Sequence, residues 1–105
     1  MDKKERGDKI YEIFMKICAC TWNIRVLSCL GFIQKYKTTG ARLFCPDDVD
    51  IDSIYYAVRK TFRNTDVMNY FDFRKGTKNI YVCVKSEYLD KVDELDTILK
   101  MKGIE

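Results

Sequence analysis

Residues 67–85 read VMNYFDFRKGTKNIYVCVK, and they carry a clear β-hairpin pattern. Two runs rich in Val, Ile, Phe and Tyr flank the polar segment 74–79, which contains a glycine. β-branched and aromatic runs on either side of such a turn are typical of two antiparallel strands. We therefore expect strands at residues 67–73 and 80–85.

The same pattern occurs earlier in the chain. FIQKYK at 32–37 and ARLFC at 41–45 flank the turn TTG at 38–40. Pro46 follows at once, and proline ends a strand because it has no N–H for the ladder. These residues predict a second hairpin.

Three helices are expected around the two hairpins, because apolar side chains recur there at helical spacing. The first is predicted over residues 8–22 with Asp8 as its cap, and the second runs from the acidic residues near 50 to Arg63. The third opens at Ser86 and ends at Gly103. For residues 24–33 a helix to about Leu30 is favoured, and a strand is the alternative.

The order of elements is therefore αββαββα, which predicts an α+β fold with a four-stranded antiparallel sheet and helices packed on one face. A chain of 105 residues, 47% of them hydrophobic, has the size and the apolar content of one domain. We expect a single α+β domain over residues 1–105. The pattern leaves the strand order open.

Composition indicates an intracellular protein. No signal peptide is visible, and the apolar run 24–33 is interrupted by Arg25 and far too short to span a bilayer. The five cysteines form an odd, scattered set, which is typical of free thiols in a reducing compartment. We expect a cytoplasmic protein with no membrane partner. The abundance of Ile, Lys, Asp and Tyr suggests AT-rich coding, as in a low-GC bacterium, a phage or a virus. We expect a protein of phage, viral or mobile-element type.

The absence of histidine excludes histidine-based catalysis and histidine metal ligands. Cys18 and Cys20 are two residues apart and would point to different sides of a helix, so they are not expected to share a metal. An acidic cluster at Asp47, Asp48 and Asp50 could support a Mg²⁺-dependent nuclease, but helix capping explains it without an ion. We expect that the protein is not an enzyme and that it has no catalytic residue, metal site or cofactor.

Basic side chains gather around the two hairpins. With a net charge of +3 the chain permits a polyanionic partner without requiring one. If both hairpin tips lie on the same edge of the sheet, their charges form one positive rim. The candidate nucleic-acid-binding residues are Lys35, Lys37, Arg42, Arg74, Lys75 and Lys78.

Strand alternation predicts an aromatic face on the side of the sheet away from the helices. Tyr70 and Tyr81 are expected there, together with Phe44 and Arg42 of the first hairpin. In proteins that bind single-stranded nucleic acid, bases stack on aromatic rings and neighbouring cations contact the phosphates. Such a face also suits a protein interface.

Two functions therefore stay open. The favoured one is a non-catalytic binding protein that acts through protein–protein contacts, as an inhibitor, an adaptor or a homodimer. The alternative is a nucleic-acid-binding protein that uses the basic hairpins and the aromatic sheet face. The acidic side chains of the last helix are a second candidate protein-binding surface; they are Glu87, Asp90, Asp93, Glu94 and Asp96.

Overall fold

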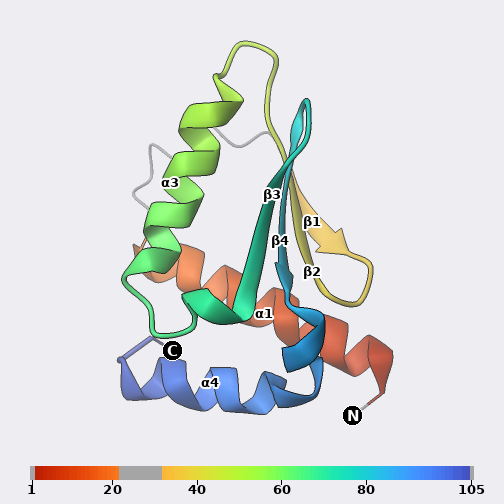
Figure 1. Ribbon diagram of the computed structural model, residues 1–105, viewed down its shortest axis with the longest axis vertical. Helices are drawn as coiled ribbons and strands as arrows, with labels where there is room; N and C mark the ends of the chain where they lie inside the picture. Colours follow the sequence, from red (N-terminus) through yellow and green to blue (C-terminus); the bar gives the residue numbers. More distant parts are fainter. Residues whose placement is uncertain (1, 22–31, 105) are drawn as a thin grey trace.

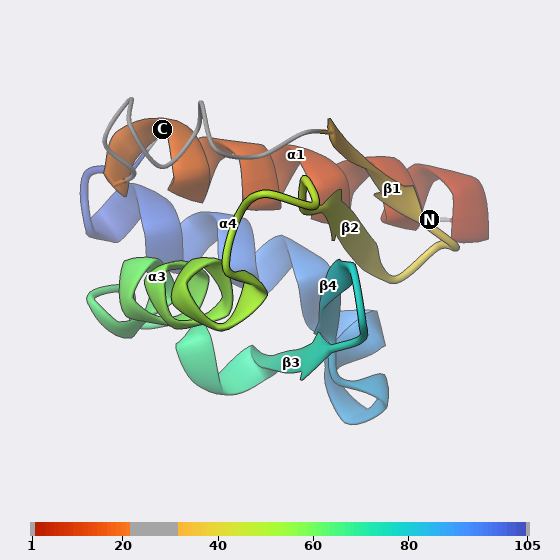
Figure 2. The ribbon, with the colours of Figure 1, turned by 90° about the horizontal axis from the view of Figure 1, so that it is seen from above.

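Four strands form one antiparallel sheet, and the helices lie on one side of it (Figures 1 and 2). The computed structural model describes residues 2–21 and 32–104. The predicted α+β class and αββαββα order are confirmed. The elements are α1 (Lys3–Thr21), β1 (Phe32–Tyr36), β2 (Gly40–Phe44), α3 (Ile51–Arg63), the 3₁₀ turn η1 (Met68–Tyr70), β3 (Phe71–Lys75), β4 (Asn79–Val84), the 3₁₀ segment η2 (Ser86–Lys91) and α4 (Val92–Met101).

The strand order is β1-β2-β4-β3, so each hairpin supplies one central and one edge strand. Gly40, which follows the first hairpin turn, lies opposite Cys83, whereas Asn79, which follows the second turn, lies opposite Phe44. The two hairpin tips are therefore at opposite ends of the sheet (Figure 1). The basic residues of the two tips therefore do not form the single positive rim that was considered from the sequence.

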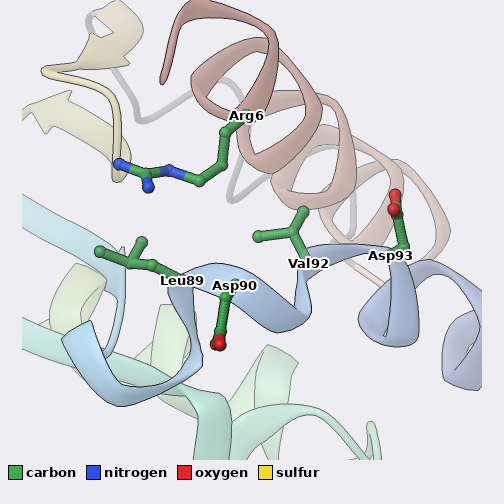
Figure 3. A pocket seen from close by; sticks show the side chains of 5 residues that line it. All are labelled: Arg6, Leu89, Asp90, Val92 and Asp93. Carbon is green, nitrogen blue, oxygen red and sulfur yellow. The ribbon is translucent and has the colours of Figure 1, made fainter. Parts of the chain in front are cut away.

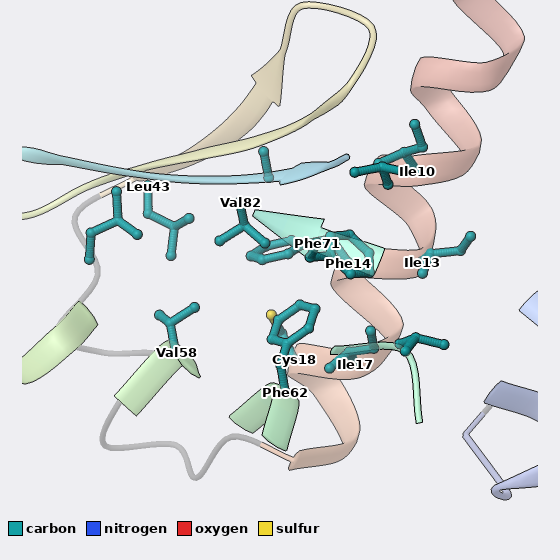
Figure 4. Close-up of a cluster of buried hydrophobic side chains, with 14 of the residues drawn as sticks. Ile10, Ile13, Phe14, Ile17, Cys18, Leu43, Val58, Phe62, Phe71 and Val82 are labelled. Carbon is teal, nitrogen blue, oxygen red and sulfur yellow. The ribbon is translucent and has the colours of Figure 1, made fainter. Parts of the chain in front are cut away.

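The core lies between the sheet and the helices, and Phe62 of α3 is at its centre (Figure 4). Its ring packs 5.9 Å from Phe14 of α1, 5.1 Å from Phe71 and 5.2 Å from Phe73, measured between ring centroids. The central strands contribute alternate side chains to the same layer: Ala41 and Leu43 from β2, and Ile80, Val82 and Val84 from β4. Burying each large apolar side chain stabilises the fold by about 1.5–3 kcal/mol.

The middle helix α3 begins and ends as its sequence predicts. The Asp50 carboxylate accepts hydrogen bonds from the Asp52 N–H (3.2 Å) and the Ser53 hydroxyl (2.8 Å), and Asn64 follows the last turn. The first helix starts earlier than predicted, at Lys3, because Asp2 caps it by accepting from the Glu5 N–H at 2.8 Å.

Two boundaries in the second half differ from prediction. Residues 68–70 form a 3₁₀ turn, so the third strand starts at Phe71 and runs on to Lys75. Val67, Met68 and Tyr70 all contact the core, which strict strand alternation does not permit. Residues 86–91 are also 3₁₀, and the last α-helix starts only at Val92. Gly103 adopts a φ of 83° just beyond its end.

Most of the segment with two alternative predictions, residues 24–33, lies outside the described residues, and only its last two residues belong to β1. In the part of the chain that the structure describes, no helix has both the length and the apolar character to cross a bilayer.

Candidate functional site

The sheet has one face that α1 and α3 do not cover (Figure 2). Alternation along each strand and the register between strands determine which side chains lie on it. We call it the open sheet face. Its residues are Gln34, Tyr36, Arg42, Phe44, Asp72, Arg74, Asn79, Tyr81 and Cys83.

Two tyrosines meet on the open sheet face, Tyr36 from edge strand β1 and Tyr81 from central strand β4. Their ring centroids are 4.8 Å apart, and the ring planes are tilted by 59°. Both side chains are half-buried. Gly40 of β2 pairs with Tyr36 in the ladder and carries no side chain, so the two rings meet across that strand.

Guanidinium groups lie over the aromatic rings of this face. Arg42 Cζ is 4.6 Å from the Phe44 ring centroid and 5.9 Å from that of Tyr36. Arg74 Cζ is 6.0 Å from the Tyr81 centroid. Such cation–π contacts hold a cation in place without neutralising its charge. Within residues 2–21 and 32–104, neither arginine forms a salt bridge, so both charges stay available to an anion.

Polar neighbours orient one of these arginines. With the Gln34 amide turned so that its oxygen faces β2, that oxygen accepts a hydrogen bond from Arg42 Nε at 3.0 Å. At the adjacent hairpin tip, Lys37 Nζ lies 5.2 Å from the Tyr36 ring centroid. The open sheet face and the adjacent hairpin tip therefore combine three cations with three aromatic rings.

Three of the six predicted nucleic-acid-binding residues are engaged elsewhere. Lys35 pairs with Asp8 of α1 at 2.7 Å, and its hydrogen bond lowers the pKa of the Asp8 carboxyl. Lys78 pairs with Asp47 at 2.7 Å, which raises the pKa of the lysine. Lys75 lies on the helix side of the sheet and pairs with Asp52 of α3. Of the remaining three, Arg42 and Arg74 lie on the open sheet face, and Lys37 lies at its corner.

The predicted aromatic set differs in one member. The structure places Phe44 and Tyr81 on the open sheet face. Tyr70 lies in η1, outside the ladder, and its ring packs 4.6 Å from that of Tyr88. Tyr36 takes the place next to Tyr81. It was absent from the predicted set, although alternation with Gln34 in FIQKY carried the signal.

The acidic and thiol groups that the structure describes form no metal-binding cluster. Among the described residues, no three His, Cys, Asp or Glu side chains come together as metal ligands. Cys18, Cys45 and Cys83 are buried free thiols. Burial raises the pKa of Cys83, and hydrogen bonds with Thr39 and Arg74 oppose the rise only in part. The thiol on the open sheet face is therefore protonated at neutral pH.

A pocket of about 320 Å³ lies between α1 and the η2–α4 segment (Figure 3). Arg6 reaches into it, donates a long hydrogen bond to Thr38 Oγ1 (3.4 Å), and leaves its Nε without a partner. Leu89, Asp90, Val92 and Asp93 form the rest of the lining. The Asp90 carboxylate points away from Arg6, so the pocket holds no paired acid and base (Figure 3).

The chain matches no known protein-family model, and searches of the curated proteins and of the solved structures gave no significant match. Its function must therefore be argued from the geometry of the site.

Proposed function

We propose that this protein binds single-stranded nucleic acid on the open sheet face. Bases would stack on Tyr36 and Tyr81, and phosphates would meet Arg42, Arg74 and Lys37. Single-strand readers combine sheet-borne aromatic rings with a cationic surface, because every base has a π-face and every nucleotide a negative charge.

One row of the sheet supports this proposal most directly. Arg42 on β2, Tyr81 on β4 and Arg74 on β3 lie side by side in register. Neighbouring strands are about 4.8 Å apart, so a ring is flanked by one guanidinium on each side within about 10 Å. A nucleotide whose base stacks on Tyr81 would have its flanking phosphates near the cations on either side.

Charge disfavours the homodimer alternative on this face. Two copies docked through their open sheet faces would bring Arg42 and Arg74 of each copy toward those of the other. Burying like charges against one another costs several kcal/mol unless each finds a counter-charge. Among the described residues, Asp72 is the only carboxylate of the open sheet face, and it cannot neutralise both arginines.

A protein partner remains a second proposal, with α4 as its surface. Met101 is 83% exposed there, and Ile98 lies in a shallow hollow beside Asp93 and Glu94. Ile98 and Met101 are three residues apart and so lie on one side of the helix, and an apolar patch with a charged rim is typical of contact surfaces. The predicted acidic set is smaller than expected, however, because Asp96 is buried.

The test of the proposed function is a pair of substitutions at each tyrosine. Tyr36→Leu and Tyr81→Leu remove a stacking ring, whereas Tyr36→Phe and Tyr81→Phe keep it. Loss of one stacked base weakens binding by about 1–3 kcal/mol, or about 5- to 150-fold. Fluorescence anisotropy with labelled single-stranded DNA and RNA measures the affinity. We expect the leucine variants to lose affinity and the phenylalanine variants to retain it; equal affinities in both would contradict stacking.

A further inference from the structure

The cationic and aromatic surface does not end at the edge of the sheet. We infer that a bound strand continues from the open sheet face, around edge strand β3, onto the C-terminal half of α3. This inference rests on the proposed function and specifies the path of the same ligand.

Tyr55 of α3 joins the two surfaces. Its hydroxyl donates a hydrogen bond to the Phe73 carbonyl oxygen at 3.0 Å, which fixes the ring beside β3. Lys75 Nζ lies 5.7 Å from the ring centroid, and Arg59 Cζ also lies 5.7 Å from it. Because Lys75 is paired with Asp52, Arg59 supplies the unpaired cation beside this ring. The ring lies at the edge of the sheet, next to Phe73, the neighbour of Arg74 in β3.

The same arrangement occurs at the next residue, which points to a neighbouring side of the helix. Tyr56 is 59% exposed, and Arg63 Cζ lies 6.0 Å from its ring centroid. Lys60, about one turn after Tyr56, is also exposed. Within the described part of the chain, Arg59, Lys60 and Arg63 form no salt bridge. Compensation of the helix dipole explains basic residues in the last turn, but it requires no exposed ring beside them.

Charge complementarity identifies the occupant. Asp50 and Asp52 lie at the N-terminal end of α3, and Asp66, beyond its C-terminal end, pairs with Lys102 at 3.6 Å. The charged side chains from Arg59 to Arg63 are all positive. A second copy of the chain would meet this surface with its own cations if it docked symmetrically. A single strand supplies both a phosphate for each cation and a base for each ring. Because the two surfaces would act on one ligand, a long strand gains affinity from the second contact without a new association step.

The experiment compares strand lengths. The Arg59→Gln/Arg63→Gln double variant changes only exposed side chains, and the wild-type protein and this variant are titrated with single strands of about 4 and about 16 nucleotides. We expect unchanged affinity for the short strand, which the open sheet face holds alone. For the long strand we expect a loss of about tenfold or more. The slope of log K against log salt should also fall by about 1.4, because each phosphate contact contributes about 0.7 in single strands.

A charge-matched control separates position from net charge. The Lys4→Gln/Lys91→Gln double variant removes two exposed positive charges outside the path, and it should bind the long strand like the wild type. Equal losses for both strand lengths, or no loss for the long strand, would overturn the path while leaving the open sheet face as the binding site. Failure of the wild type to bind either strand would overturn the proposed function as well.

Discussion

Asp96 shows how far one side chain can depart from its sequence context. It is 8% exposed and accepts from Lys9 (3.1 Å) and Lys16 (3.2 Å) of α1, with Lys100 at 3.7 Å. Burial alone raises the pKa of the Asp96 carboxyl, but the hydrogen bonds from Lys9 and Lys16 outweigh burial and hold it below its ordinary value. The carboxylate therefore links α4 to α1.

We predict that Asp96→Asn lowers the free energy of unfolding at neutral pH by about 1–2 kcal/mol, because charged hydrogen bonds are lost. A depressed folded-state pKa stabilises the protein fully above the unfolded value of about 3.9. That stabilisation is lost as the pH falls through the lower folded value. Urea unfolding at several pH values measures the difference.

The exposed Asp93 on the same helix provides the control, and Asp93→Asn should change stability little. A wild-type advantage over Asp96→Asn that stayed constant down to pH 2 would contradict the ion-pair interpretation.

The sequence placed Asp96 among the surface acids because Asp93, Glu94 and Asp96 share a polar pattern. The three lysines that surround it come from α1 and from the next turn of α4, so only packing of the two helices reveals its burial. Tyr36 is the opposite case. Alternation with Gln34 was sufficient to place it on the aromatic face.

Among the elements, the β2–β4 pair depends on Gly40. A Cβ at this position would lie 2.1 Å from the Val82 carbonyl oxygen and 2.7 Å from Cys83 Cα, both backbone atoms of β4. We predict that Gly40→Ala forces the two central strands apart and lowers the free energy of unfolding by about 1–3 kcal/mol or more. Gly76→Ala is the control, since its Cβ would approach nothing closer than 3.5 Å. Thermal unfolding should show a clear fall in Tm for Gly40→Ala alone; equal Tm values would contradict the close approach.

Element boundaries were predictable where local signals decide them. Asp50 and Asn64 fix the two ends of α3 from the sequence alone. The turn η1 was not predictable, because Val67, Met68 and Tyr70 are compatible with a strand until their joint packing on the core excludes it. For the same reason the sequence wrongly predicted Tyr70 on the aromatic sheet face, whereas it lies in η1 beside Tyr88.

At the scale of the whole molecule, the class and the order of elements followed from the sequence, but the strand order did not. The order β1-β2-β4-β3 sets the hairpin tips at opposite ends and divides the basic residues among separate surfaces. It also brings Tyr36 and Tyr81, which are far apart in the chain, into contact. Pairing between hairpins is a long-range choice that hydrophobic periodicity does not encode.

The central claim is that the open sheet face binds single-stranded nucleic acid through Arg42 and Arg74. The most direct measurement is a salt titration of the affinity for labelled single strands by fluorescence anisotropy, with the wild type, Arg42→Gln/Arg74→Gln and the charge-matched Lys4→Gln/Lys91→Gln variant. We predict binding by the wild type that weakens steeply with salt, and a slope smaller by about 1.4 in the arginine variant alone. No binding by the wild type at about 50 mM salt, or identical slopes in all three proteins, would contradict the account.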